Sequence, residues 1–235
     1  MEASAQPPRL SRVAVFSCIF LPFALGHFLS CLMRNVNAVL APFLVGTMHL
    51  TPAQLGLLTS ALFFSFALVQ LPVGIALDRY GPRKVQLVLM LLAAGGAWMF
   101  ATGHSFMQLV LARAIIGCGL GGCFMSAVKA ISTWIAPKRL PSVQGYLIAV
   151  GGLGAASSTM PVRSLLQHTD WRGLFMMLAL LSVFCGLLIW LVTPRNRIAA
   201  GAGSLTVRSV LDVYRARAFR TTISLVLMPH AVFGC

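Results

Sequence analysis

Residues 74–84 read Gly74-Ile-Ala-Leu-Asp78-Arg79-Tyr-Gly81-Pro-Arg83-Lys84, which places one acid and three bases in a short segment. Apolar runs flank this segment on both sides, over Pro52–Leu77 and Val85–Thr102. A helix that spans a bilayer needs about 20 mostly apolar residues, and both runs are close to that length. The pattern predicts two membrane helices joined by a charged loop at the membrane surface.

The composition of the whole chain supports a membrane protein. The 235 residues are 58% hydrophobic and 9% charged, whereas soluble domains carry about 25% charged residues. The net charge of +14 would indicate nucleic acid in a soluble protein. Here the bases lie between apolar runs, which favours basic loops on one side of a membrane. We therefore expect an all-α membrane protein with no nucleic-acid partner.

The apolar runs divide the chain into segments. We expect a cytoplasmic tail over 1–12, a six-helix transmembrane region over 13–193, a cytoplasmic basic amphipathic linker over 194–221, and over 222–235 the start of a seventh helix too short to span. Thr51-Pro52-Ala53-Gln54 predicts a capping box at one helix start. The six expected spans are Val13–Val45, Pro52–Leu77, Val85–Thr102, Phe106–Ile135, Ser142–Leu166 and Arg172–Thr193.

The loop charges predict the orientation of the helices. Most basic residues fall in the tail, in the loops after the second and fourth spans, and after the sixth, whereas the opposite connections hold only Arg172, at the edge of a span. Because cytoplasmic loops are enriched in Lys and Arg, we expect a cytoplasmic N-terminus and a location in the cell's inner membrane. The linker helix expected over Leu205–Phe219 would lie on anionic lipid.

The 74–84 segment resembles the loop signature of the major facilitator superfamily, G-x-x-x-D-R-x-G-x-R-[RK], at every specified position. The resemblance implies a gate that latches the cytoplasmic ends of two transporter halves. Physically, a glycine on a helix allows close approach of a neighbour, and a glycine in a loop permits a sharp turn. The residues implied in the gate are Gly74, Asp78, Arg79, Gly81, Arg83 and Lys84.

Further motifs extend the resemblance along the chain. Arg113-Ala-Ile-Ile-Gly117-Cys-Gly119-Leu-Gly121 is similar to the family's R-x-x-x-G-x-G-x-G pattern, and the glycine-rich run over 145–156 predicts tight helix contact. Members of this family have two six-helix halves with the substrate between them. The resemblance therefore implies that this chain is the N-terminal half plus the start of helix 7, and that transport needs the missing C-terminal half or a second copy.

Three basic residues fall well inside the expected spans, whereas Arg163 and Arg172 lie near span ends. A charge costs about 2.5–3.5 kcal/mol at a helix centre. The three residues well inside are Arg34, Arg113 and Lys129. Arg34 lies seven residues outward of the middle of Val13–Ala41, and Arg113 lies about as far outward of the middle of Phe106–Ile135. Both distances are roughly 10 Å at 1.5 Å per residue. The sequence has no Asp or Glu between Glu2 and Asp78 or between Asp78 and Asp170. We therefore expect the missing counter-charge to be an anionic substrate.

Leu32-Met33-Arg34-Asn35 resembles the helix 1 arginine region of the organophosphate and organic-anion transporters. That resemblance implies that Arg34 grips the anion, with Arg113 converging on it, while Asn37 and Lys129 complete the expected substrate-binding set. An arginine suits the role because its planar fork binds oxyanions and stays charged. Alternatives remain open: Arg113 as a structural or proton-path residue, Lys129 reaching the interface, and Arg34 at the outer surface. His27 is either a proton-linked switch or a core residue.

The predicted function is secondary active transport of a small organic anion by alternating access, with a coupling proton possible and no cofactor. The alternatives are a nitrate/nitrite-type or other solute facilitator, or a transport-inactive half acting as a membrane interaction module. The nitrate signature expects an asparagine in helix 5, which residues 149–154 lack. We expect no enzyme, no catalytic residue and no metal site, because the chain has no HExxH, GxSxG or CxxC motif.

Overall fold

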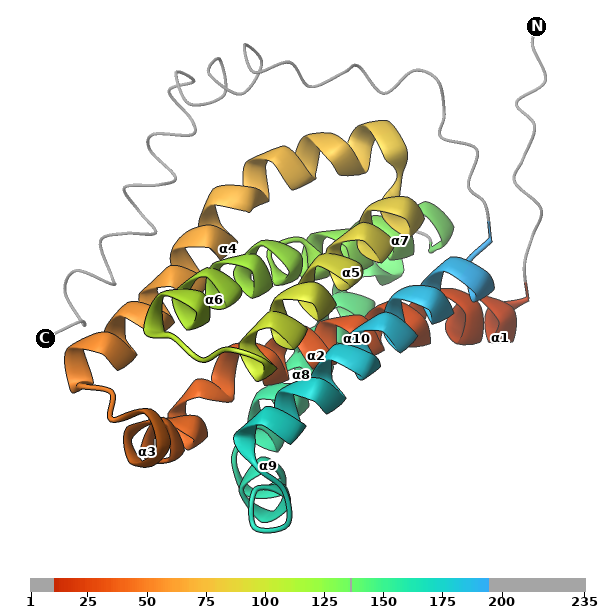
Figure 1. Ribbon diagram of the computed structural model, residues 1–235. Helices are drawn as coiled ribbons and strands as arrows, with labels where there is room; N and C mark the ends of the chain where they lie inside the picture. Colours follow the sequence, from red (N-terminus) through yellow and green to blue (C-terminus); the bar gives the residue numbers. More distant parts are fainter. Residues whose placement is uncertain (1–10, 136, 195–235) are drawn as a thin grey trace, which may run out of the picture. The chain divides into compact units, whose positions relative to one another are not determined.

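A computed structural model describes residues 11–135 and 137–194, and every regular element within them is a helix (Figure 1). The all-α fold class is therefore confirmed. The expected amphipathic linker and the start of a seventh helix lie outside the described residues. The elements are α1 (Arg12–Val15), the π-helix η1 (Phe16–Phe20), α2 (Leu21–Asn35), α3 (Asn37–Met48), α4 (Pro52–Tyr80), α5 (Pro82–Ala101), α6 (Phe106–Leu120), α7 (Cys123–Trp134), the 3-10 helix η2 (Pro137–Arg139), α8 (Leu140–Ser157), α9 (Met160–Leu165) and α10 (Trp171–Val192).

Five stretches of helix in the described part are long and apolar enough to cross a membrane: Val13–Asn35, Pro52–Tyr80, Pro82–Ala101, Phe106–Trp134 and Trp171–Val192. The fifth expected span, Ser142–Leu166, is instead divided between α8 and α9. The hydroxyls of Ser158 and Thr159 each bond a carbonyl three residues back, at 2.6 Å, where the helix is interrupted. Such local side-chain bonds compete with the helical pattern.

The first expected span, Val13–Val45, is also not one helix. α2 ends at Asn35, α3 begins at Asn37, and Figure 1 shows α3 turned away from the direction of α2. The side-chain amide of Asn35 donates to the carbonyl of Cys31 at 2.8 Å, next to the interruption. α3 then ends at Met48 and is followed by its C-cap, His49, the one non-glycine residue with positive φ (52°) in the described part. The boundary expected at Val45 was therefore wrong.

Glycines hold α6 close to two neighbours. A Cβ on Gly117 would overlap the carbonyl oxygen of Leu62 in α4, and one on Gly119 would overlap the backbone nitrogen of Ala93 in α5. From the other side of the same contact, a Cβ on Gly96 of α5 would lie 2.8 Å from the backbone nitrogen of Ile116 in α6. These backbones approach more closely than any side chain allows, so Gly117 and Gly119 of the 113–121 motif lie at the centre of this packing.

α5 and α10 run antiparallel, and an arginine from the first turn of each bonds the last turn of the other. Arg83 Nε donates to the carbonyl of Trp190 at 2.8 Å, and Arg172 Nη1 donates to the carbonyl of Ala101 at 2.8 Å. Carbonyls in the last turn of a helix have no intrahelical donor and carry a partial negative charge. The two arginines therefore cap both ends of this helix pair.

Candidate functional site

A polar cavity of about 270 Å³ lies between α2, α4 and the junction of α6 with α7. Three of its residues come from α2, at positions 27, 30 and 34, so they share one face of that helix. The α6–α7 junction contributes because the helix is interrupted at Gly121 and Gly122. The lining residues are His27, Ser30, Arg34, Phe66, Gln70, Leu120, Gly121, Phe124 and Met125.

Arg34 is half-buried in the wall of this cavity. Its Nη2 atom donates to Cys31 Sγ at 3.1 Å, its Cζ atom lies 4.9 Å from the ring centroid of Phe66, and its Nε atom is buried without a hydrogen-bond partner. A thiol and an aromatic face are weak partners for a guanidinium. No carboxylate in the described part of the chain forms a salt bridge with Arg34. The cavity therefore holds a cation whose charge is not neutralised by these residues.

His27 lies one turn below Cys31 on the same face of α2. Its Nε2 atom is 3.7 Å from Cys31 Sγ, its ring stacks at a tilt on Phe124 with the centroids 5.2 Å apart, and its Nδ1 atom has no partner. Ser30 Oγ donates to the carbonyl of Leu120 at 3.5 Å. The imidazole thus has one free nitrogen at the edge of the cavity that contains Arg34.

Arg113 is fully buried, and it does not line the cavity. Its Cζ atom lies 4.4 Å from the ring centroid of Phe100 and 5.1 Å from that of Phe175. Its Nη2 atom donates to Asn37 Oδ1 at 2.5 Å, and Asn37 in turn donates to the hydroxyl of Thr59 at 2.5 Å. The structure therefore brings together Arg113 and Asn37 from the expected set, but it places Arg34 in different surroundings.

Lys129 forms a salt bridge with Asp78, and the two side chains are 36% and 28% exposed. This pair joins α7 to the end of α4. Lys129 also lines a second cavity of about 420 Å³ together with Phe124, Met125, Val128 and Ser132. Phe124 and Met125 line both cavities, so the lysine lies beside the cavity of Arg34 rather than in it.

The remaining loop residues have distinct surroundings. Gly81 has φ 79°, a backbone region that favours glycine, which confirms the expected turn. Arg79 lies over the ring of Tyr80 at 5.4 Å, and Lys84 lines an apolar hollow with Tyr80. Among the described residues, a Cβ on Gly74 would meet no atom within 4 Å, so the close approach expected at Gly74 stays a prediction for a neighbour outside this set.

Of the cavity wall, sequence reasoning named only His27 and Arg34 as candidate functional residues, and those that it missed include Ser30, Phe66, Gln70 and Phe124. Gln70 carried a usable signal, because an amide within the apolar run of α4 is costly unless it faces a polar space. Phe66 lies one helical turn from Gln70, on the same face. Within residues 11–135 and 137–194, no group of three or more His, Cys, Asp or Glu side chains is placed to hold a metal ion.

These features define a multi-pass helical membrane protein with a solute-sized polar cavity among its helices. The family model of the Major Facilitator Superfamily matches residues 23–234. The chain belongs to this superfamily, which confirms the resemblance found in the sequence.

Individual relatives are named as transporters of several anions. The chain is 31% identical to the "Probable sulfoacetate transporter SauU" of Cupriavidus necator over 68% of its own length and 37% of that protein. It is 29% identical to the "Probable L-galactonate transporter" of Escherichia coli, over 80% of this chain and 41% of the relative. A nitrate/nitrite transporter of Picosynechococcus is 36% identical over 37% of this chain and 16% of the relative. The chain thus spans about two fifths of the length of the first two relatives.

Proposed function

We propose that this chain is the N-terminal half of a transporter that moves a small organic anion by alternating access. The observation that supports the proposal is Arg34, a guanidinium in a cavity among membrane helices, with no acid paired to it in the described residues. A cation at membrane depth is costly unless it meets a counter-charge. A visiting anion would supply that charge, and it would find the planar donor fork that oxyanions prefer. Membership of a transporter family, rather than any enzyme motif, fits this role.

The cavity wall favours an organic body on the anion. Phe66, Leu120 and Phe124 give apolar faces, while Ser30 and Gln70 offer neutral hydrogen bonds. A carboxylate or sulfonate on a short carbon chain would use both kinds of surface. Relatives named for sulfoacetate, L-galactonate and hexuronate agree with this substrate class. Relatives named for nitrate and nitrite keep an inorganic anion as the second candidate.

The other expected site residues would contact substrate only after the bonds that they make in this structure are broken. Arg113 would contact substrate once Asn37 releases its guanidinium, and Lys129 would do so once its salt bridge with Asp78 opens. The gate proposed for residues 74–84 would act through the surface that this half presents to the second half. His27, with one free ring nitrogen beside Arg34, is the proposed site for a coupling proton. A cytoplasmic N-terminus, an inner-membrane location and a second six-helix half complete the proposal.

The test uses the full-length protein, meaning this chain together with the proposed second six-helix half, reconstituted in vesicles. Arg34→Gln should abolish counterflow of sulfoacetate and of a hexuronate, whereas Arg34→Lys should keep weak transport because it keeps the charge. Arg139→Gln, at an exposed arginine of η2, is the matched control and should transport normally. All variants should insert to the same level, as measured by membrane yield.

Normal counterflow by Arg34→Gln would show that the anion site lies elsewhere. Nitrate counterflow that depends on Arg34, with no organic anion transported, would establish the second candidate instead. An absence of counterflow for every anion, by the unsubstituted protein as well, would favour a membrane interaction module.

A further inference from the structure

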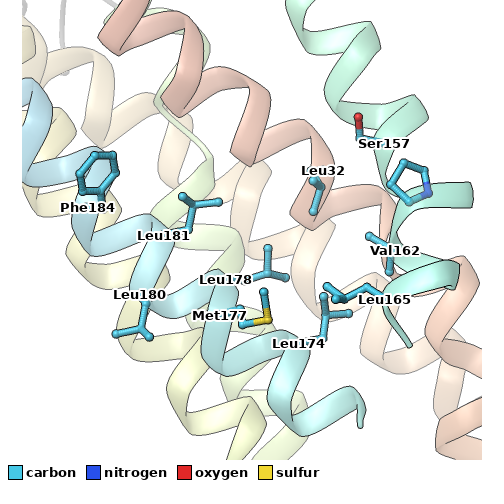
Figure 2. Close-up of a pocket in the computed structure, with 11 residues that line it drawn as sticks. Leu32, Ser157, Val162, Leu165, Leu174, Met177, Leu178, Leu180, Leu181 and Phe184 are labelled. Carbon is cyan, nitrogen blue, oxygen red and sulfur yellow. The ribbon is translucent and has the colours of Figure 1, made fainter. Parts of the chain in front are cut away.

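A hollow of about 550 Å³ lies between α2, the α8–α9 pair and α10, and Figure 2 shows Leu32 of α2 and Leu165 of α9 facing Leu178 of α10. Its wall is almost wholly apolar and has no charged residue, so it selects no particular ligand. Buried polar atoms are more selective, because nearly all such atoms in native proteins have a hydrogen-bond partner.

Two polar side chains are buried among the helices without a hydrogen bond. Gln86 of α5 and Ser126 of α7 are both 0% exposed. The Nε2 and Oε1 atoms of Gln86 and the Oγ atom of Ser126 have no partner among the described residues. Burying an amide or a hydroxyl in this way is costly. The three atoms therefore require a partner other than the side chains and backbone around them.

The antiparallel packing of α5 on α6 and α7 brings these two side chains together. A Cβ on Gly122, directly before α7, would lie 2.6 Å from Leu89 Cδ1 of α5. Residues three or four apart share one face of a helix, so the next turn of each helix places Ser126 opposite Gln86. The thiol of Cys123 lies within reach of the Gln86 amide, but a thiol is only a weak hydrogen-bond partner.

A glycine of α2 leaves space beside the amide. The position that a Cβ on Gly26 would take lies 3.2 Å from Gln86 Nε2 and 3.5 Å from Ile189 Cδ1. A space of about one methyl group therefore remains at hydrogen-bond distance from the amide nitrogen. Because Gln86 also faces α7, the helices α2, α5 and α7 surround a small polar site.

The polar atoms of this site select the ligand. The amide nitrogen of Gln86 donates, its amide oxygen accepts, and the Ser126 hydroxyl can do either. A metal cation would leave the amide nitrogen unpaired, and an anion would leave the amide oxygen unpaired. A water molecule both donates and accepts, and buried waters make about three hydrogen bonds to groups of this kind. We propose that Gln86 and Ser126 bind an internal water molecule that joins α5 to α7 beside Gly26.

The water site lies behind the wall of the Arg34 cavity. Cys123 is within reach of Gln86 on one side and of Ser30, which lines the cavity, on the other. A water held at this point would fix the positions of α5 and α7 behind α2, the helix that carries Arg34. The site would have this role whether or not the cavity binds an organic anion.

The first test detects the water directly in the full-length protein in detergent. X-ray radiolysis produces hydroxyl radicals from bound as well as bulk water, and the radicals oxidise the side chains that they contact. Cys123 is 1% exposed, so bulk water does not reach it readily. We expect dose-dependent oxidation of Cys123, measured by mass spectrometry, and its loss in the Gln86→Leu protein. Ser182→Ala should leave the oxidation unchanged, because Ser182 is equally buried but bonds the Leu178 carbonyl.

An absence of oxidation at Cys123 in the unsubstituted protein would overturn the proposal. Oxidation that continues unchanged in Gln86→Leu would also overturn it, because the water would then be held by other groups.

A double-mutant cycle tests whether Gln86 and Ser126 share one water. Gln86→Leu and Ser126→Ala should each lower the unfolding midpoint in detergent, because each leaves the water and the other side chain short of a bond. The double variant should be about as stable as the less stable single variant, since coupled groups depart from additivity. Without a shared water, each substitution would remove an unpaired polar group. Higher midpoints for both single variants, or fully additive losses, would therefore contradict the shared site.

Discussion

At the scale of single residues, Arg113 shows how a buried cation is held where the described residues provide no acid for it. Two aromatic faces cover its guanidinium, and Asn37 supplies a hydrogen bond at 2.5 Å, while the Nε and Nη1 atoms have no partner. Removing one partner of a buried charged group costs more than removing both. Asn37 is therefore the weak point of this arrangement, since it also ties the start of α3 to Thr59.

We predict that Asn37→Ala destabilises the full-length protein by about 2 kcal/mol, the cost of leaving a buried charged donor without its acceptor. The measurement is the unfolding midpoint in detergent. Asn35→Ala is the matched control, because Asn35 is exposed and bonds only the carbonyl of Cys31 within its own helix. If both alanine variants unfold at the same temperature, the bond between Arg113 and Asn37 contributes nothing to stability.

The sequence predicted single unusual residues of the site but not the contacts between them. Arg34 was found because a charge inside an apolar run is rare and costly. The salt bridge of Asp78 with Lys129 was missed, because its partners are 51 residues apart and a single sequence gives no contact between distant segments. For that reason Lys129 was expected at the substrate site, although it pairs with the loop.

At the scale of helices, α5 offers two adjacent glycines with opposite surroundings. A Cβ on Gly96 would lie 2.8 Å from the backbone nitrogen of Ile116, whereas a Cβ on Gly95 would meet nothing within 4 Å. We predict that Gly96→Ala lowers the unfolding midpoint, because α5 and α6 must move apart. Gly95→Ala should leave it unchanged or raise it, because alanine favours helix by about 0.5–1 kcal/mol over glycine.

The comparison of these two variants is made under identical detergent conditions, with secondary structure checked by circular dichroism. Equal midpoints would contradict the close packing of α5 on α6. A loss of stability in both would indicate that Gly95 also contacts protein, on a surface that residues 11–135 and 137–194 leave open.

The ends of helices could be predicted where hydropathy changes sharply along the sequence. Interruptions within a continuously apolar run could not be predicted. The capping box at Thr51 was predicted and is present, with Thr51 N–H donating to Gln54 Oε1 at 2.8 Å and Gln54 N–H donating to the Thr51 hydroxyl at 3.3 Å. The interruptions at Val36 and at Ser158 were not predicted, because both runs remain apolar on either side. Side-chain bonds to nearby carbonyls mark these places, and a hydropathy pattern does not weigh them.

At the scale of the whole molecule, the charged loop is bound to this part of the protein at two points. Asp78 pairs with Lys129 of α7, and Arg83 bonds the carbonyl of Trp190 at the end of α10. An ion pair held within one half can move with that half as a rigid body. A gate of this kind would therefore act by shaping the surface that meets the second half, rather than by Asp78 bridging the two.

Exchanging the two charges separates these mechanisms in the full-length protein. We predict that Asp78→Lys and Lys129→Asp each reduce counterflow strongly, because each leaves two like charges facing across α4 and α7. The double variant should recover much of the rate, since the pair is restored with opposite polarity and coupled residues depart from additivity. The matched control is Lys138→Asp, which reverses an exposed charge of η2, outside the gate residues, and should change the rate little. A double variant as inactive as Asp78→Lys would mean that the carboxylate acts on a partner beyond this ion pair, and the gate would then have to cross between the halves.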